Sequence, residues 1–343
     1  MGLTVANQEL HREKVLVTGA AGYVGCVLTP RLLDAGYEVT VYDIMYYGRE
    51  NLPAHPNLTV VVGDIRDTPG LARAFAGKDA VLHLACISND PSFELDAELS
   101  KSINYDCFEP MVAAAKAAGV RRFVYCSTSS VYGVSEAPDV TEDHPLVPLT
   151  QYNEYKGLCE PLLFKHMDDD FTCVALRPAT ICGYSPRLRL DLSVNILTIH
   201  AITQGKITVF GGGQLRPSLH IEDKCDVYEL LLKAPSEKIQ GQIFNVGYQN
   251  NAIADIAEIV AHIVADEFPD KGNIEIVTTP TDDPRSYHIN SDKIRRVLGY
   301  SPRRTIEDAV RDVCIAYKAG KIPNAMDDDH YYNVRYMKML NAA

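Results

Sequence analysis

A tyrosine and a lysine stand four residues apart at Tyr152 and Lys156. Positions i and i+4 of a helix share one face, so the phenol and the ammonium would lie together. A free tyrosine has a pKa near ~10 and is a poor base at neutral pH, but a nearby positive charge favours its phenolate. The pair therefore predicts a general base for a hydroxyl proton. The alternative is a chance pair on an amphipathic helix; Tyr155 does not compete, because Cys159 follows it at the same spacing.

A glycine-rich turn close to the start of the chain predicts a dinucleotide site. Residues 15–25 read VLVTGAAGYVG, which indicates a strand, a tight turn and the start of a helix. The first glycine permits the turn, the second lets the backbone approach a pyrophosphate, and the third lets helix and strand pack. The free N–H groups and the positive dipole end of the helix would face the phosphates. An ordinary strand–helix turn is the alternative. The predicted contacts are Gly19, Gly22, Tyr23, Val24 and Gly25.

An acidic residue, Asp43, closes the next strand at the ~20-residue distance expected for a ribose-binding carboxylate. Its oxygens can accept hydrogen bonds from both adenosine ribose hydroxyls, whereas its charge would repel a 2′-phosphate. No arginine follows it directly. This pattern predicts NAD rather than NADP as the cofactor, and a plain turn residue is the alternative.

The GxxGxxG spacing and several later segments resemble the extended branch of the short-chain dehydrogenase/reductase family. The segments 126–133 (CSTSSVYG) and 152–156 (YNEYK) look like its catalytic signatures, and the resemblance runs from about Lys14 to about Tyr317. It implies that Thr128 holds the reacting oxygen beside Tyr152 and Lys156. It also implies further cofactor contacts in the first half of the chain: Asp64, Ile65, Leu84, Ala85, Asn104, Ser127, Tyr152, Lys156 and Pro178.

The second half of the chain resembles the part of this branch that binds nucleoside diphosphate sugars. Residues 177–183 (RPATICG) are similar to an Arg-Pro-x-Asn-x-Tyr-Gly segment, but Thr180 replaces the asparagine and Cys182 the tyrosine. Arginine suits phosphate because its fork gives two parallel bonds, although solvated surface arginines are the alternative. The resemblance implies these substrate contacts: Ser88, Thr180, Asn195, Arg216 and Arg285.

The residues after Thr128 separate the reactions of this branch. Sugar 4,6-dehydratases place an acidic pair there, for removal of the C5 proton and departure of the C6 hydroxyl. Ser129 and Ser130 occupy these positions here, and a serine at neutral pH supplies neither function well. We therefore expect hydride transfer at C4 through a 4-keto sugar, as in UDP-galactose 4-epimerase and enzymes of bacterial surface polysaccharides. A 4-dehydrogenase or ketoreductase is the alternative; a 4,6-dehydratase, a steroid or flavonoid ketoreductase and a non-catalytic NAD sensor fit less well.

The elements that must carry these residues alternate between strands and helices. Six short, continuously apolar runs predict strands that are covered on both faces, hence a parallel, doubly wound Rossmann sheet. We expect residues 1–178 to form mainly the NAD-binding domain, and residues 179–343 mainly a smaller, loop-rich substrate lobe with segments returning to the sheet. Helices expected at 94–118 and 152–166 resemble the pair that forms a four-helix homodimer interface in this family. The predicted strands are 15–18, 38–42, 58–62, 80–84, 123–126 and 172–176, and the other predicted helices are 23–35, 69–76, 222–233, 254–266, 291–298 and 306–318.

The composition narrows the class further. A net charge of −12 is not typical of a nucleic-acid or membrane-surface binder. The nine cysteines form no CxxC pair and no zinc-type cluster, so we expect no metal and read them as free thiols in a cytoplasmic protein. We expect neither a signal peptide nor a membrane span, because charged residues interrupt the first segment and no run approaches about 18 apolar residues. Residues 327–343 are rich in Asp and Tyr, and no motif places them.

Overall fold

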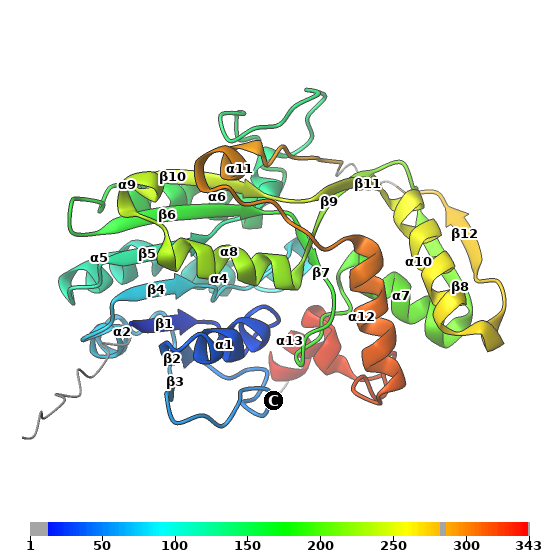
Figure 1. Ribbon diagram of the computed structural model, residues 1–343, viewed down its shortest axis with the longest axis horizontal. Helices are drawn as coiled ribbons and strands as arrows, with labels where there is room; N and C mark the ends of the chain where they lie inside the picture. The colour runs from blue at the N-terminus through cyan, green and yellow to red at the C-terminus, as the bar shows by residue number, and fades with distance from the viewer. Residues whose placement is uncertain (1–12, 282–285, 342–343) are drawn as a thin grey trace, which may run out of the picture.

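The computed structural model describes residues 13–281 and 286–341, and a parallel sheet of seven strands forms its centre (Figure 1). All six predicted strands are present, and a seventh from the second half joins them at one edge, so the predicted Rossmann-like α/β fold is confirmed. From edge to edge the order is β10 (Gln242–Val246), β6 (Thr172–Pro178), β5 (Arg122–Cys126), β4 (Ala80–His83), β1 (Lys14–Thr18), β2 (Glu38–Asp43) and β3 (Leu58–Val62).

Helices cover both faces of this sheet. On one face α1 packs against α8, and on the other α5 packs against both α2 and α6 (Figure 1). The central strands feed both layers, since Val15 and Val17 of β1 belong to one hydrophobic core and Leu16 to the other. This burial explains the continuous apolar runs. The helices are α1 (Gly25–Asp34), α2 (Thr68–Phe75), α5 (Phe108–Ala117), α6 (Gln151–Phe164) and α8 (Ile221–Lys233).

The expectation of two covered faces is wrong for β3. This strand lies at the edge of the sheet, and Val62 at its end is 65% exposed. An apolar run alone does not reveal that a strand will lie at an edge, because that depends on the order of the strands in the sheet.

The helix expected at 94–118 is not continuous. The structure has α3 (Asp90–Phe93), α4 (Ala97–Lys101), a π-helical turn (Ser102–Asp106) and then α5. Asp96 starts the new segment by accepting a hydrogen bond from the backbone N–H of Leu99 at 2.9 Å. The extra residue of the π turn carries Asn104 toward the loop after β4.

The second lobe contains more regular structure than its glycines and prolines suggested. One sheet joins β7 (Thr180–Cys182), β9 (Leu215–His220) and β11 (Gln249–Ala252), and another joins β8 (Lys206–Phe210) and β12 (Glu275–Thr279). The helix α7 (Ser193–Gln204) was not predicted, because it packs against two other helices and its apolar residues cover more than one face. Its partners are α10 (Ile253–Glu267) and α12 (Ile306–Lys318). The remaining helices are α9 (Ser236–Ile239), α11 (Asp292–Leu298) and α13 (Asn333–Asn341), with 3₁₀ turns at Ser129–Tyr132, Pro269–Lys271 and Asp329–Tyr331.

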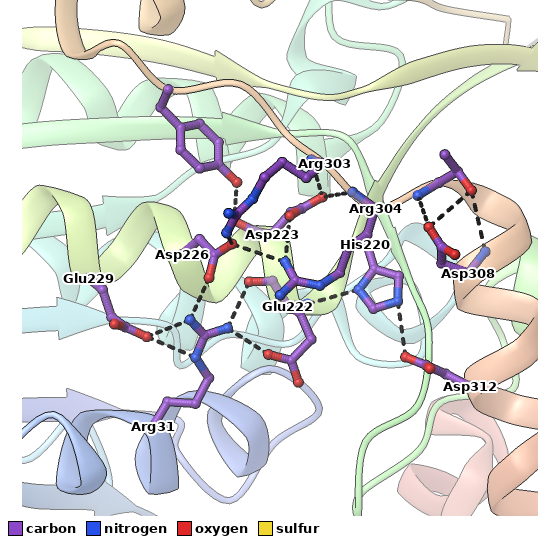
Figure 2. A network of polar contacts seen from close by, with 12 residues as sticks. Arg31, His220, Glu222, Asp223, Asp226, Glu229, Arg303, Arg304, Asp308 and Asp312 are labelled. Carbon is purple, nitrogen blue, oxygen red and sulfur yellow. Dashed lines mark hydrogen bonds and ion pairs between the residues drawn. The ribbon is translucent and has the colours of Figure 1, made fainter.

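A network of charges fastens the second half of the chain to α1 (Figure 2). Arg31 of α1 forms ion pairs with Glu222, Asp226 and Glu229 of α8 at 2.5–2.7 Å. Asp223, whose side chain is fully buried, accepts bonds from the backbone N–H groups of residues 303 and 304 and from the Arg304 guanidinium. Burial would raise the pKa of Asp226, but the three arginines around it hold that pKa below its ordinary value.

None of the helices in the described part of the chain combines the length and apolar character needed to cross a membrane.

Candidate functional site

A cavity of about 880 Å³ lies at the carboxyl ends of the central strands and continues to the second lobe. The strand order reverses between β1 and β4, and ligands of open α/β sheets bind at such a point. The cavity collects most of the predicted site residues into one space: Gly19, Gly22, Tyr23, Val24, Gly25, Asp43, Asp64, Ile65, Leu84, Ala85, Ser88, Ser127, Thr128, Tyr152, Lys156, Pro178, Thr180 and Arg216.

The glycine turn is shaped by close backbone contacts. Gly19 has φ +73°, and a Cβ there would meet the backbone of Ala85 at 2.6 Å. A Cβ on Gly25 would lie 2.3 Å from the backbone of Ala20, so only glycine fits where the helix leaves the turn. The amino end of α1 has no side-chain cap and no acidic residue in its first turn. Its N–H groups are therefore suited to an anion.

Asp43 ties the glycine turn to the loop after β2. Its carboxylate accepts hydrogen bonds from the backbone N–H of Ala21 at 2.9 Å and of Met45 at 2.8 Å. Burial raises the pKa of Asp43, and these two bonds oppose that shift. A carboxylate that is held in this way keeps lone pairs free for hydroxyl donors in the cavity.

The loop after β3 carries a second acid, Asp64, in a different environment. Arg66 pairs with it at 2.5 Å, and its hydrogen bonds hold the pKa of Asp64 below the ordinary value. The preceding Gly63 lies so close to the ring of Tyr42 that a Cβ would approach it to 2.4 Å. Ile65 adds an apolar wall at this end of the cavity.

Thr128 begins the 3₁₀ turn after β5 and belongs to a chain of hydroxyl groups. Its Oγ1 accepts from the backbone N–H of Ser130 and lies 2.8 Å from the Ser130 hydroxyl. Ser130 in turn donates to the side chain of Asn153 on α6. Ser129 is buried, and its hydroxyl has no hydrogen-bond partner in the described structure. Of the two serines that follow Thr128, only Ser130 lines the cavity.

Tyr152 and Lys156 both reach the cavity from α6. Burial raises the pKa of the Tyr152 phenol well above its ordinary value, and Cys86, Cys126 and Asp90 add to this effect. The ammonium of Lys156 donates a hydrogen bond to the backbone carbonyl of Cys126. Lys156 therefore places its charge at the end of β5. The groups of the protein alone raise the pKa of the Tyr152 phenol and do not lower it.

A thiol and a second lysine, which the sequence did not single out, line the same wall. Lys224 of α8 lies 3.2 Å from the sulfur of Cys126. Burial would raise the pKa of this thiol, but Lys224 and Lys156 outweigh it and the pKa is lowered. The spacing of Lys224 gave no signal, because α8 comes to this wall only through the packing of the two halves.

The second lobe supplies the opposite wall. The guanidinium of Arg216 on β9 lies 5.6 Å from the ring centroid of Tyr287, and the hydroxyl of Thr180 lies 3.3 Å from that of Tyr287. Phe210 and Ile253 add apolar surface. Of these residues, the sequence predicted only Arg216 and Thr180.

Two predicted ligand contacts lie behind the cavity wall. Asn104 is buried and exchanges two hydrogen bonds of 2.8 Å with the backbone of Ile87. Asn195 accepts from the backbone N–H of Gly183 and donates to the hydroxyl of Tyr23 and the carbonyl of residue 189. Both amides position the loops that line the cavity. Arg285 lies outside the described residues.

Two further polar groups serve the protein interior. Arg177 forms a buried pair with Glu160 at 2.6 Å and also donates to the hydroxyl of Tyr132. Ser127 lines the cavity, but its hydroxyl donates to Glu160 at 2.7 Å. Arg177 is therefore a structural residue beneath the site.

The residues present fit a bound NAD. The uncapped amino end of α1 suits a pyrophosphate, Asp43 suits a ribose diol, and the lining runs without a break from Asp64 to Tyr152. The glycine turn would hold the pyrophosphate and Asp43 the adenosine ribose. The nicotinamide end would lie beside Thr128 and Tyr152.

Comparison with known proteins agrees with this geometry. Residues 15–247 match the NAD dependent epimerase/dehydratase family. A dTDP-glucose 4,6-dehydratase of Streptomyces griseus is 30% identical, over 86% of this chain and 91% of the relative. A UDP-glucose 4-epimerase of Lactobacillus helveticus is 29% identical, over 87% and 94%. The crystal structure of DesIV, a dTDP-glucose 4,6-dehydratase from Streptomyces venezuelae with NAD and TYD bound, superposes with a TM-score of 0.78 at 25% identity, over 90% of this chain and 98% of that one.

The chain belongs to the NAD dependent epimerase/dehydratase family. It is an enzyme of that family, and the predicted NAD cofactor and the resemblance to this branch are confirmed. The two relatives named above catalyse different reactions, so membership alone does not choose between epimerisation and dehydration.

Proposed function

We propose that this enzyme epimerises a nucleotide sugar by hydride transfer at C4 through a 4-keto sugar. The observation that carries the proposal is that Tyr152 and Thr128 share one continuous cavity with Arg216 and Thr180. A group for oxidising an alcohol and a group for holding a phosphate thereby face the same ligand.

The chain's own residues then have distinct tasks. Thr128 holds the C4 oxygen by a hydrogen bond, and Tyr152 takes its proton as the carbon is oxidised. Oxidised nicotinamide, when bound, would bring a positive charge that favours the phenolate, would take the hydride from C4 and would return it to the other face of the 4-keto sugar, while Tyr152 gives the proton back to the oxygen. Lys156, fixed on the carbonyl of Cys126, orients the ribose side of the cofactor. Arg216 binds the substrate's diphosphate through its fork.

The environment of the two serines supports epimerisation over 4,6-dehydration. Ser129 does not reach the cavity, and the hydroxyl of Ser130 is committed to Thr128 and Asn153. Neither side chain supplies a base for the C5 proton or an acid for the C6 hydroxyl.

Of the two carboxylates that could replace the missing acidic pair, Glu136 and Asp90, only Asp90 reaches the cavity. It lines the cavity and accepts a hydrogen bond from Thr150 at 2.7 Å. Asp191 also lines the cavity, but Arg189 binds it through two contacts of 3.0 Å. A dehydratase would therefore depend on Asp90.

The product decides between the reactions. The purified enzyme is incubated with UDP- and dTDP-linked hexoses, and the products are analysed by mass spectrometry and by the absorbance of reduced cofactor. We expect an isomer of unchanged mass and no net reduction of NAD. A product lighter by one water, which Asp90→Asn abolishes while NAD is retained, would replace epimerisation by dehydration. A product lighter by two hydrogens, with accumulating reduced cofactor, would identify a 4-dehydrogenase, the second candidate.

We also propose a homodimer that pairs α5 and α6 of one protomer with those of its partner. Leu158 on α6 is 41% exposed, which gives this face an apolar contact point. Light scattering after size exclusion should give twice the chain mass, and Leu158→Glu should reduce it to one. A monomeric wild type would contradict the proposal.

With all nine cysteines free, we expect the enzyme to work in the reducing cytoplasm.

A further inference from the structure

A buried arginine of the second lobe, Arg187, lines the cavity without a counter-ion. Its side chain belongs to a residue that is only 5% exposed, and its Nε has no hydrogen-bond partner in the described structure. No carboxylate of the described residues lies within ion-pair distance of it. A buried charge without a partner destabilises a protein unless a ligand supplies the opposite charge.

The nearby acidic group is already taken. The carboxylate of Asp191 receives two bonds from Arg189 and a third from Asn89 at 2.7 Å. Burial lowers the pKa of Arg187, but a guanidinium remains charged at neutral pH in any case.

The position of Arg187 associates it with the cofactor side of the cavity. The segment before it is fastened to the glycine turn, since Tyr23 donates to the carbonyl of Gly183 at 2.6 Å and Ser185 donates to the carbonyl of Tyr23 at 2.7 Å. The backbone of Arg187 itself lies against the thiol of Cys26 in the first turn of α1. The segment that carries Arg187 is therefore anchored at the helix end that suits a pyrophosphate.

The rest of the guanidinium is held by Tyr47 of the loop after β2 and by Asn333 of α13, which lies in the tail that no sequence motif placed. Arg187 stacks 3.6 Å above the ring of Tyr47, and its Nη2 donates to Oδ1 of Asn333 at 2.5 Å. Asn333 also accepts from the hydroxyl of Tyr47 and donates to that of Ser88, both at 3.1 Å. The tail is anchored in turn by Tyr336, which stacks on Tyr47 and donates to the carbonyl of Tyr46.

We propose that Arg187 binds the diphosphate of NAD from the second lobe, and that Asn333 of α13 is the positioning residue that aims its guanidinium. The cofactor's diphosphate thus lies between the amino end of α1 and a clamp made by Tyr47, Arg187 and Asn333. The C-terminal helix completes the cofactor site, and it can do so whichever sugar reaction the enzyme catalyses.

The primary test is the affinity of the stripped, full-length protein for NAD, measured by isothermal titration calorimetry. Arg187→Met removes a charged hydrogen bond and should weaken NAD binding about ten- to a hundredfold. Arg49→Met is the matched control, because Arg49 is exposed in the same loop as Tyr47 and does not line the cavity. It should change the affinity by less than about twofold. Unchanged NAD affinity in Arg187→Met would overturn the proposal.

A second arm separates the cofactor's diphosphate from that of a substrate. The NAD-loaded Arg187→Met protein is titrated with UDP and dTDP, which should bind as they do to the wild type. If UDP or dTDP binding is lost while NAD affinity is unchanged, Arg187 serves the substrate and the proposal fails.

A variant at Asn333 tests the clamp with a side chain of nearly the same size and shape. Asn333→Asp gives Arg187 a carboxylate partner, so the stripped protein should melt at or above the wild-type temperature while its NAD affinity falls. Asn273→Asp, the same charge change at an exposed site, should leave NAD affinity unchanged. NAD affinity at the wild-type level in Asn333→Asp would show that Asn333 does not position the guanidinium.

Discussion

The ammonium of Lys156 donates a hydrogen bond to the backbone carbonyl of Cys126. The lysine that follows Tyr152 by one helical turn is therefore fixed to the end of β5. This contact joins α6 to β5, while the half-buried Tyr152 lines the cavity with its ring 6.4 Å from that of Phe93. The roles of these two residues can therefore be tested separately.

The first prediction concerns the base. Tyr152→Phe removes only the hydroxyl group, so the protein should keep its fold and its NAD while turnover falls by about two to four orders of magnitude. Tyr155→Phe is the matched control, since the ring of Tyr155 stacks on Tyr105 at 5.1 Å and does not line the cavity. Turnover is measured with the substrate identified by the product assay. Near-normal kcat in Tyr152→Phe would require a different base.

The pH dependence gives a second prediction. Burial raises the pKa of Tyr152, and negative charge on Cys86 and Cys126 adds to this effect. Because the phenolate is the base, kcat/KM should rise with pH up to that pKa. Cys126→Ala removes this charge and frees Lys224, and both changes favour the phenolate. The rising limb of the profile should therefore move to lower pH. A limb that stays in place or moves to higher pH would contradict this electrostatic coupling.

Cofactor choice gives a third prediction. Asp43→Ser removes the carboxylate that repels a 2′-phosphate, so NAD affinity should fall and NADP affinity should rise. Calorimetric titration of the stripped variant with both dinucleotides measures the ratio. Asp43→Ser also loses two hydrogen bonds to backbone N–H groups, which should destabilise the loop after β2. Thermal melting is therefore followed in parallel. An unchanged NAD to NADP ratio would mean that Asp43 does not select the cofactor.

A fourth prediction uses His83 beneath the glycine turn. Its Nδ1 lies 2.7 Å from the hydroxyl of Thr18, and burial, helped by Lys156, lowers its pKa from 6.5 to about 3. In the unfolded chain His83 is protonated below pH 6.5, whereas in the folded protein it stays neutral down to about pH 3. The folded state therefore loses stability as the pH falls from 6.5 to about 3. His83→Gln should flatten that part of the curve of unfolding free energy against pH. His262→Gln, at an exposed site, should leave the curve unchanged.

The last prediction concerns the network of Figure 2. Asp223→Asn removes a fully buried charge that is paired with Arg304, which should cost about 3–5 kcal/mol of unfolding free energy. Asp292→Asn breaks an exposed pair with Arg295 and should cost less than about 1 kcal/mol. Denaturant unfolding of the two variants compares them directly. Equal losses would mean that the buried pair of Asp223 and Arg304 does not hold the segment before α12 against α8.

Local sequence patterns determined most of the first half of this chain. The strands β1, β2, β4, β5 and β6 are continuous apolar runs because both faces of the sheet are covered there, and the sequence pattern shows that burial without knowledge of the fold. The glycine turn, Asp43, and the pair Tyr152 and Lys156 depend on spacings of a few residues, so one stretch of chain fixes each of them. The same patterns could not show that β3 lies at an edge, or that a π turn interrupts the helix before α5.

Tertiary structure decided which of the polar residues meet. Arg177 pairs with Glu160 in the core, whereas Arg187, ten residues later, reaches the cavity, and no sequence rule separates the two arginines. Asn333 lies 245 residues from Ser88 and 146 from Arg187, yet its amide bonds to both. Such contacts arise when elements distant in the chain pack together and buried polar groups must find partners, a condition that acts on the folded molecule and leaves no periodic trace in the sequence.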